Sequence, residues 1–137
     1  MGEVRVKIKL TNAVDEVLAR RGQLPREQVR AVETEGIVDT GAVVSTMPES
    51  VFQELGLDVW NEIDAWLADD KSVRVRQTDA VNIEIEGRRT SESMLVLGSA
   101  VLIGQTLLER LDFLVDCPGQ RIIPNPAHGN QMVLMIR

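Results

Sequence analysis

The stretch Ile37-Val38-Asp39-Thr40-Gly41-Ala42 decides how this chain is interpreted. Two apolar residues end a strand-like segment, and a carboxylate follows at the start of a turn. Thr40 adds a hydroxyl beside that carboxylate, Gly41 lets the backbone approach closely because it has no Cβ, and Ala42 keeps the surroundings small. Asp-Thr-Gly is also an ordinary turn sequence, so the triplet alone fits a purely structural role.

The segments before this stretch have the pattern of a β-hairpin. Residues 3–10 alternate charged and apolar side chains, which predicts a strand. Residues 11–27 are polar and contain Gly and Pro, so we interpret them mainly as a long connection with room for a helical turn. Residues 29–38 are predicted to form the second strand, which delivers Asp39 into its turn.

The segments after it predict further short elements. Pro48 at a first-turn position and Gly56 as a stop signal indicate a helix over 49–55. The remaining predicted strands are 63–68, 72–78, 81–86, 93–97, 101–103, 112–116, 121–123 and 131–136, with a second helix over 105–111. Many short strands with two short helices predict an all-β chain that closes into a small barrel.

Length and composition limit the possible classes of protein. The 137 residues suit one domain spanning 1–137. No apolar run approaches the ~20 residues that cross a bilayer, and the N-terminus has no signal-peptide pattern, so we expect a cytoplasmic protein without membrane contact. The net charge of −6, with scattered basic residues, argues against nucleic-acid binding.

Few residues are suited to metal or thiol chemistry. Cys117 and His128 are the only cysteine and histidine, so we expect no internal disulfide, no His-based metal cluster and no cofactor. We interpret Cys117 as packed or incidentally exposed, and His128 as a surface-loop residue. Ordinary packing is also favoured over a ligand cleft for Trp60 and Trp66.

A second motif completes the pattern about sixty residues later. Val101-Leu102-Ile103-Gly104 is an apolar run that ends in glycine and opens a Leu-rich helix. With the Asp39 motif and the order of elements, it resembles the retropepsin-like aspartic proteases of clan AA, most closely the bacterial single-domain members. The resemblance covers nearly the whole chain and is strongest over 38–42 and 102–108.

This resemblance implies a closed retropepsin-like acid-protease barrel, one lobe per subunit, and a homodimeric endopeptidase acting on a peptide or protein substrate. Asp39 would be the catalytic carboxylate that each subunit donates, because only one Asp-Thr-Gly occurs in the chain. Thr40 would bond across the dimer axis, Gly41 would present its carbonyl to substrate, and Ala42 would support the same loop.

The resemblance also assigns the surroundings of that loop. Ile103 and Gly104 would lie behind it, where the preceding strand threads past. The hairpin over 63–78 would be the flap that closes over substrate, with Trp66 on its strand and its tip at Asp69-Asp70-Lys71. The terminal strands 3–10 and 131–136 would interleave with those of the partner.

Two departures from the viral members affect this interpretation. Those members pair an acidic residue with an Arg at the positions that Val43 and Gln105 occupy here, and their flap tip is glycine-rich. The alternatives are a non-catalytic dimeric peptide-binding or scaffolding module with the same fold and, more remotely, an antitoxin-like partner protein in which Asp39 is only a turn residue.

Overall fold

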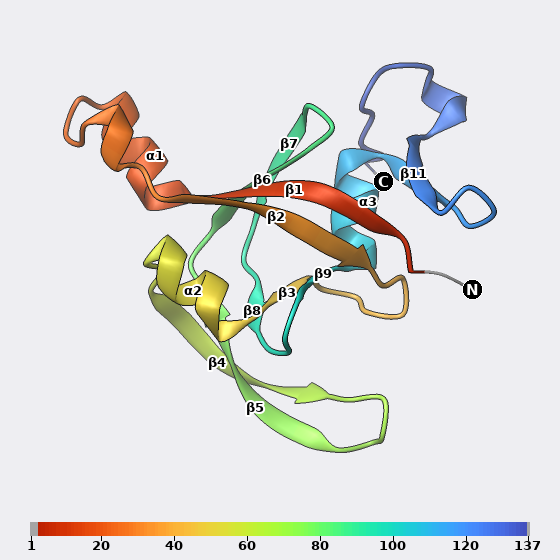
Figure 1. The fold of residues 1–137 in the computed structure, drawn as a ribbon, viewed down its shortest axis with the longest axis horizontal. Helices are drawn as coiled ribbons and strands as arrows, with labels where there is room; N and C mark the ends of the chain where they lie inside the picture. Colours follow the sequence, from red (N-terminus) through yellow and green to blue (C-terminus); the bar gives the residue numbers. More distant parts are fainter. Residues whose placement is uncertain (1–2, 137) are drawn as a thin grey trace.

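The computed structural model describes residues 3–136, which form a mainly β fold with short helices (Figure 1). The strands are β1 (Arg5–Asn12), β2 (Ala31–Val38), β3 (Thr46–Met47), β4 (Val59–Trp66), β5 (Ser72–Thr78), β6 (Val81–Ile85), β7 (Arg88–Glu92), β8 (Leu95–Val96), β9 (Val101–Ile103), β10 (Phe113–Asp116) and β11 (Arg121–Pro124). The helices are α1 (Ala13–Arg20), α2 (Glu49–Leu55) and α3 (Gln105–Leu111), with 3₁₀ turns η1 (Arg26–Gln28) and η2 (Pro126–His128). The prediction of a mainly β chain is confirmed. The two predicted helices correspond to α2 and α3, and the structure has α1 in addition.

The main sheet is curled but open. Its strand order is β4-β5-β8-β3-β9-β2-β1-β6-β7, and β10 pairs only with β11 in a separate two-stranded sheet. Within residues 3–136, the end strands β4 and β7 do not pair with each other, so the predicted closed barrel is wrong. Helix α3 packs beside β7, whereas β4 belongs to a hairpin that extends away from the body (Figure 1).

The alternating strands bury one face. Ile8 and Leu10 of β1 are buried while Lys7 and Lys9 between them are exposed. Apolar side chains of β6 and α3 complete the same core, and full burial of each contributes about 1.5–3 kcal/mol. The core thus forms inside the curl of the sheet.

The connection between β1 and β2 is more ordered than predicted. It contains α1, whose N-cap Asn12 accepts a hydrogen bond from the Asp15 amide at 3.0 Å. The buried Asp15 carboxylate accepts from the Arg30 guanidinium at 2.8 and 3.0 Å and from the Arg30 amide at 3.0 Å. Hydrogen bonds from Arg30 hold the pKa of Asp15 below its ordinary value, outweighing the opposite effect of burial. This pair fastens α1 to the start of β2.

The return strand after β6 begins earlier than predicted. Glu86 and Gly87 take positive φ values of 49° and 81°, which form a tight hairpin turn, and β7 follows at once. Leu95–Val96 of the predicted strand 93–97 instead forms β8, which pairs with β3 and β5.

The predicted strand over 131–136 is absent from the described chain. No ladder holds this segment, and the Val133 amide donates to the Asp112 carboxylate instead. From Met132 to Ile136 the side chains are uniformly apolar rather than alternating, so no face is selected for burial.

Helices in the described part of the chain reach at most eight residues, so none of them is long and apolar enough to cross a membrane.

Candidate functional site

Asp39 begins the loop that joins β2 to β3. Its amide donates to the Ile103 carbonyl at 2.9 Å, which anchors the end of β2. Its side-chain Oδ1 accepts from the Gly41 amide at 3.1 Å, and its carbonyl accepts from the Ala42 amide at 3.1 Å. The carboxylate is therefore held in a tight turn while it stays exposed to solvent.

Strand β9 threads between the two strands that flank this loop. It runs parallel to β2, with Ile103 opposite Val38, and antiparallel to β3, with Leu102 opposite Thr46. As a result β2 and β3 do not pair with each other, and the loop over 39–45 crosses the end of β9 (Figure 1).

Gly104 lies directly behind the loop. A Cβ at this position would be 2.7 Å from the carbonyl carbon and oxygen of Val44 and 3.0 Å from the Ala42 oxygen. Because the obstructing atoms are backbone, no side-chain movement would relieve the contact. The Gly104 amide also donates to the buried Ser45 hydroxyl at 2.9 Å. Only glycine fits here without moving the loop.

Helix α3 continues this anchoring. The Gln105 amide donates to the Ala42 carbonyl at 2.8 Å, and the Thr106 amide and hydroxyl donate to the Val43 carbonyl at 3.1 and 2.7 Å. The first amides of a helix have no intrahelical partner, so the loop satisfies them and is fixed in return. Sequence analysis missed Thr106; a hydroxyl in the first turn after Gly104 was the available signal.

The rim of the loop is exposed. Thr40 and Gly41 face solvent, and Val43 is 68% exposed beside the partly exposed Val44. Gln105, which stands where viral members carry Arg, donates to Glu109 of its own helix at 3.2 Å. The Asp39 loop therefore presents an apolar surface beside its carboxylate.

The predicted flap is the β4–β5 hairpin. Asp70 takes a left-handed φ of 63°, and the Lys71 amide donates to the Asp69 carboxylate at 3.1 Å, so the tip is a tight turn that is exposed to solvent. Trp60 and Trp66 are 67% and 76% exposed, so the interpretation that they pack in the core is wrong. In Figure 1 the hairpin tip and the loop over 39–45 extend toward the same side of the molecule.

The base of this hairpin is braced on α2. The Arg76 guanidinium bonds the Glu49 carboxylate and lies over the Phe52 ring, 5.0 Å from its centroid. The hydrogen bond from Arg76 lowers the pKa of Glu49. We therefore expect the β4–β5 hairpin to be more mobile at its tip than at its base on α2.

The interpretation of His128 as a simple surface residue is wrong. Its ring is half-buried, and Nδ1 lies 2.5 Å from the Asp112 carboxylate. Cys117 is exposed and free, as one of the two sequence interpretations had it. Neither residue contributes to the Asp39 loop.

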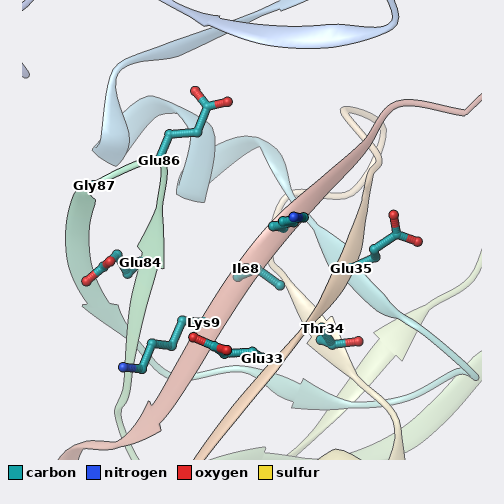
Figure 2. A pocket seen from close by; sticks show the side chains of 9 residues that line it. Ile8, Lys9, Glu33, Thr34, Glu35, Glu84, Glu86 and Gly87 are labelled. Carbon is teal, nitrogen blue, oxygen red and sulfur yellow. The ribbon is translucent and has the colours of Figure 1, made fainter.

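A hollow on the outer face of the sheet offers a different kind of surface. It encloses about 570 Å³ and is lined by charged residues of β1, β2 and β6 (Figure 2). One cross-strand row of this face alternates in sign: Glu33, Lys9, Glu84 and Arg89 stand opposite one another in register. Such pairs support the sheet by themselves, so the row gives no reason to assign a ligand to the hollow. Asp39 lies about 13 Å beyond Glu35, by strand rise.

No group of three or more His, Cys, Asp or Glu side chains within residues 3–136 is placed to hold a metal ion. The chain matches no protein-family model, and no curated protein is significantly similar to it.

Proposed function

We propose that this chain is one subunit of a homodimeric, retropepsin-like aspartic endopeptidase in which two copies of Asp39 form the catalytic pair. The observation that carries the proposal is the fixed Asp39 loop. It crosses the end of β9, rests on Gly104, and is bonded to the first turn of α3. An ordinary turn needs no such support, whereas a catalytic carboxylate must be held in place.

The chemistry follows from pairing two carboxylates. When two such groups lie close together they cannot both ionise, so the pair holds one proton. The ionised oxygen removes a proton from a bound water, which attacks the peptide carbonyl, while the protonated oxygen donates to the developing oxyanion. Acid and base roles thus belong to the pair rather than to one copy of Asp39.

A two-fold dimer would supply the second carboxylate. Two-fold dimers are the commonest oligomers, and each subunit would contribute the same surface. The exposed apolar side chains of Val43, Met135 (75% exposed) and Ile136 (91% exposed) support such an interface, since burying them would stabilise it. In this proposal the apolar contacts stabilise the dimer in place of the acidic–Arg ion pair of the viral members, which Val43 and Gln105 cannot form.

Substitution of Asp39 by Asn tests the proposal. Asn keeps the acceptor for the Gly41 amide but cannot exchange a proton, so we expect cleavage of a quenched fluorescent peptide library to be abolished while the dimer persists. Asp58→Asn is the matched control, because it removes an equivalent exposed charge outside the loop. Wild-type protein that cleaves no member of the library between pH 3 and 8 would contradict the proposal.

A non-catalytic peptide-binding dimer is the second candidate. The acidic, exposed tip at Asp69 and Asp70 favours it, because a hairpin that closes on substrate in the viral manner is glycine-rich there. Capture of library peptides without cleavage, measured on the same samples, would distinguish it from the endopeptidase.

A further inference from the structure

A second, larger hollow adjoins the one in Figure 2 and shares Lys9, Glu84 and Gly87 with it. It encloses about 1070 Å³ and is lined by β1, β6 and β7 together with the α1–η1 connection. None of residues 39–45 lines it, so the Asp39 loop does not explain it. We call it the basic hollow, and its charged lining residues are Lys9, Glu16, Arg20, Arg26, Glu84, Arg88 and Arg89.

The charge of the basic hollow is opposite in sign to that of the whole chain. Five of its charged residues are basic and two are acidic, which leaves a local charge of +3, whereas the chain carries −6. The hollow of Figure 2 has the reverse balance, with two lysines and four glutamates. A concave surface lined by one sign of charge attracts ligands of the other sign. The basic hollow is therefore suited to an anion.

Three of these cations are available to a ligand. Within residues 3–136, no ion pair shorter than 4.0 Å engages Lys9, Arg20 or Arg89, and all three are exposed. Glu84 stands between Lys9 and Arg89 in the strand register and offsets part of their charge. Arg20, in the last turn of α1, has no such neighbour in the register.

The segment that carries Arg20 is braced. Glu16 accepts from the Arg26 guanidinium at 2.5 Å, which joins α1 to η1, and Asp15 accepts from Arg30, which joins α1 to the start of β2. Arg20 therefore projects from a segment that is fixed at two points. A cation held in place loses less conformational freedom on binding than one on a mobile loop.

The other side of the basic hollow is fixed as well. The Arg88 guanidinium donates to the Leu111 and Asp112 carbonyls at 2.8 and 2.9 Å and lies over the Phe113 ring, 4.9 Å from its centroid. Arg88 thus anchors β7 on the end of α3. The next residue, Arg89, carries the cation that remains for a ligand on this side.

Short side chains form a cross-strand row inside the hollow. In register order they are Ala31, Thr11, Asn82 and Ser91. Because they are shorter than the charged side chains around them, the surface is recessed there, and the hydroxyls and the amide can donate or accept hydrogen bonds. Among the described lining residues there is no aromatic ring on which a nucleic-acid base could stack.

We propose that the basic hollow docks a carboxylate-rich segment of a partner protein, an extended stretch with several Asp or Glu residues. Arg20 and Arg89 bind its carboxylates, because a guanidinium presents paired N–H donors that match the two carboxylate oxygens. A peptide can space its charges to avoid Glu16 and Glu84, whereas a nucleic-acid strand carries a charge on every phosphate. This inference goes beyond the proposed function and does not depend on it.

Fluorescence anisotropy tests the docking. The probe is a fluorescein-labelled peptide of about eight residues that alternates Asp and Gly, long enough at ~3.3 Å per extended residue to cross the hollow. We expect it to bind the wild type, more weakly as salt rises, while the peptide with Asn in place of Asp binds at least about tenfold more weakly. Equal binding of the two peptides would overturn the inference.

Arginine substitutions locate the binding surface. Arg20→Gln and Arg89→Gln should each raise the dissociation constant of the Asp peptide by about threefold to tenfold. Arg21→Gln is the matched control, because Arg21 is the next residue, is also exposed and does not line the hollow. Equal weakening by Arg20→Gln and Arg21→Gln would show attraction to net charge alone and would refute the site.

Removal of an acid should have the opposite effect. Glu16→Gln takes a negative charge out of the hollow and releases Arg26, so the Asp peptide should bind several-fold more tightly, which partial unfolding could not produce. Glu27→Gln, an exposed change on η1 outside the lining, should leave the affinity near that of the wild type. Unchanged affinity in Glu16→Gln, or tighter binding of a single-stranded oligonucleotide than of the Asp peptide, would overturn the proposal. The assay measures binding without cleavage, so either result leaves the proposed function standing.

Discussion

The amide of Gly104 donates a hydrogen bond to the hydroxyl of Ser45, 2.9 Å away and 59 residues earlier in the chain. Both residues are buried, and this contact joins the end of β9 to the end of the Asp39 loop. The loop geometry therefore depends on a residue that lies far from Asp39 in sequence.

Gly104→Ala should destabilise the protein by about 1–3 kcal/mol, because the added Cβ would overlap the Val44 carbonyl. Urea denaturation measures the change. We also expect peptide cleavage to fall by more than the loss of folded protein explains, since the loop must shift. A variant with wild-type stability and cleavage would show that the close contact is not needed.

Ser45→Ala should cost about 1–3 kcal/mol, because it leaves the buried Gly104 amide without an acceptor. Ser50→Ala is the control, since Ser50 is exposed on α2 and its loss should change the unfolding free energy by less than about 0.5 kcal/mol. Equal losses of unfolding free energy for the two substitutions would show that the hydrogen bond from Gly104 to Ser45 does not stabilise the fold.

The ion pair of Asp15 and Arg30 should make stability depend on pH. Because the pKa of Asp15 lies below its ordinary value of 3.8, its contribution is complete above that value and disappears as pH falls through the lowered pKa. Asp15→Asn should cost about 1.5–3 kcal/mol at neutral pH and progressively less in acid. Glu3→Gln, which removes an exposed pair with Arg5, should cost at most about 1 kcal/mol. Unfolding free energies across pH 2–7 test both; a pH-independent Asp15→Asn penalty would refute the linkage.

Trp66→Ala should separate the flap from the core. Because the side chain is 76% exposed, the unfolding free energy should change by less than about 0.5 kcal/mol. If the β4–β5 hairpin covers substrate, KM should rise several-fold. Trp60→Ala is the matched control, because Trp60 is also exposed (67%) but lies further from the tip, and this variant should leave KM near wild type. Equal KM values for the two variants would show that Trp66 does not contact substrate.

Local sequence signals placed most elements and the candidate loop. Gly56, with φ of 61°, ends α2 where its position after Leu55 predicted, and Val101–Ile103 and Gln105–Leu111 form the strand and helix on either side of Gly104. Such signals come from residues that are close together in the sequence: the backbone conformation that one residue prefers, and the spacing of apolar residues along one segment.

Only the tertiary structure decided which strands pair and which side chains contact one another. Whether the curled sheet closes, where the apolar run at 132–136 goes, and which donors reach Asp112 all depend on residues distant in sequence. The bond between His128 and Asp112 spans 16 residues and follows no local period, so the sequence predicted a surface loop there. By itself the sequence determined a β chain with Asp39 at a turn; packing determined that β9 and Gly104 hold that turn in place, because contacts between backbones depend on the path of the whole chain.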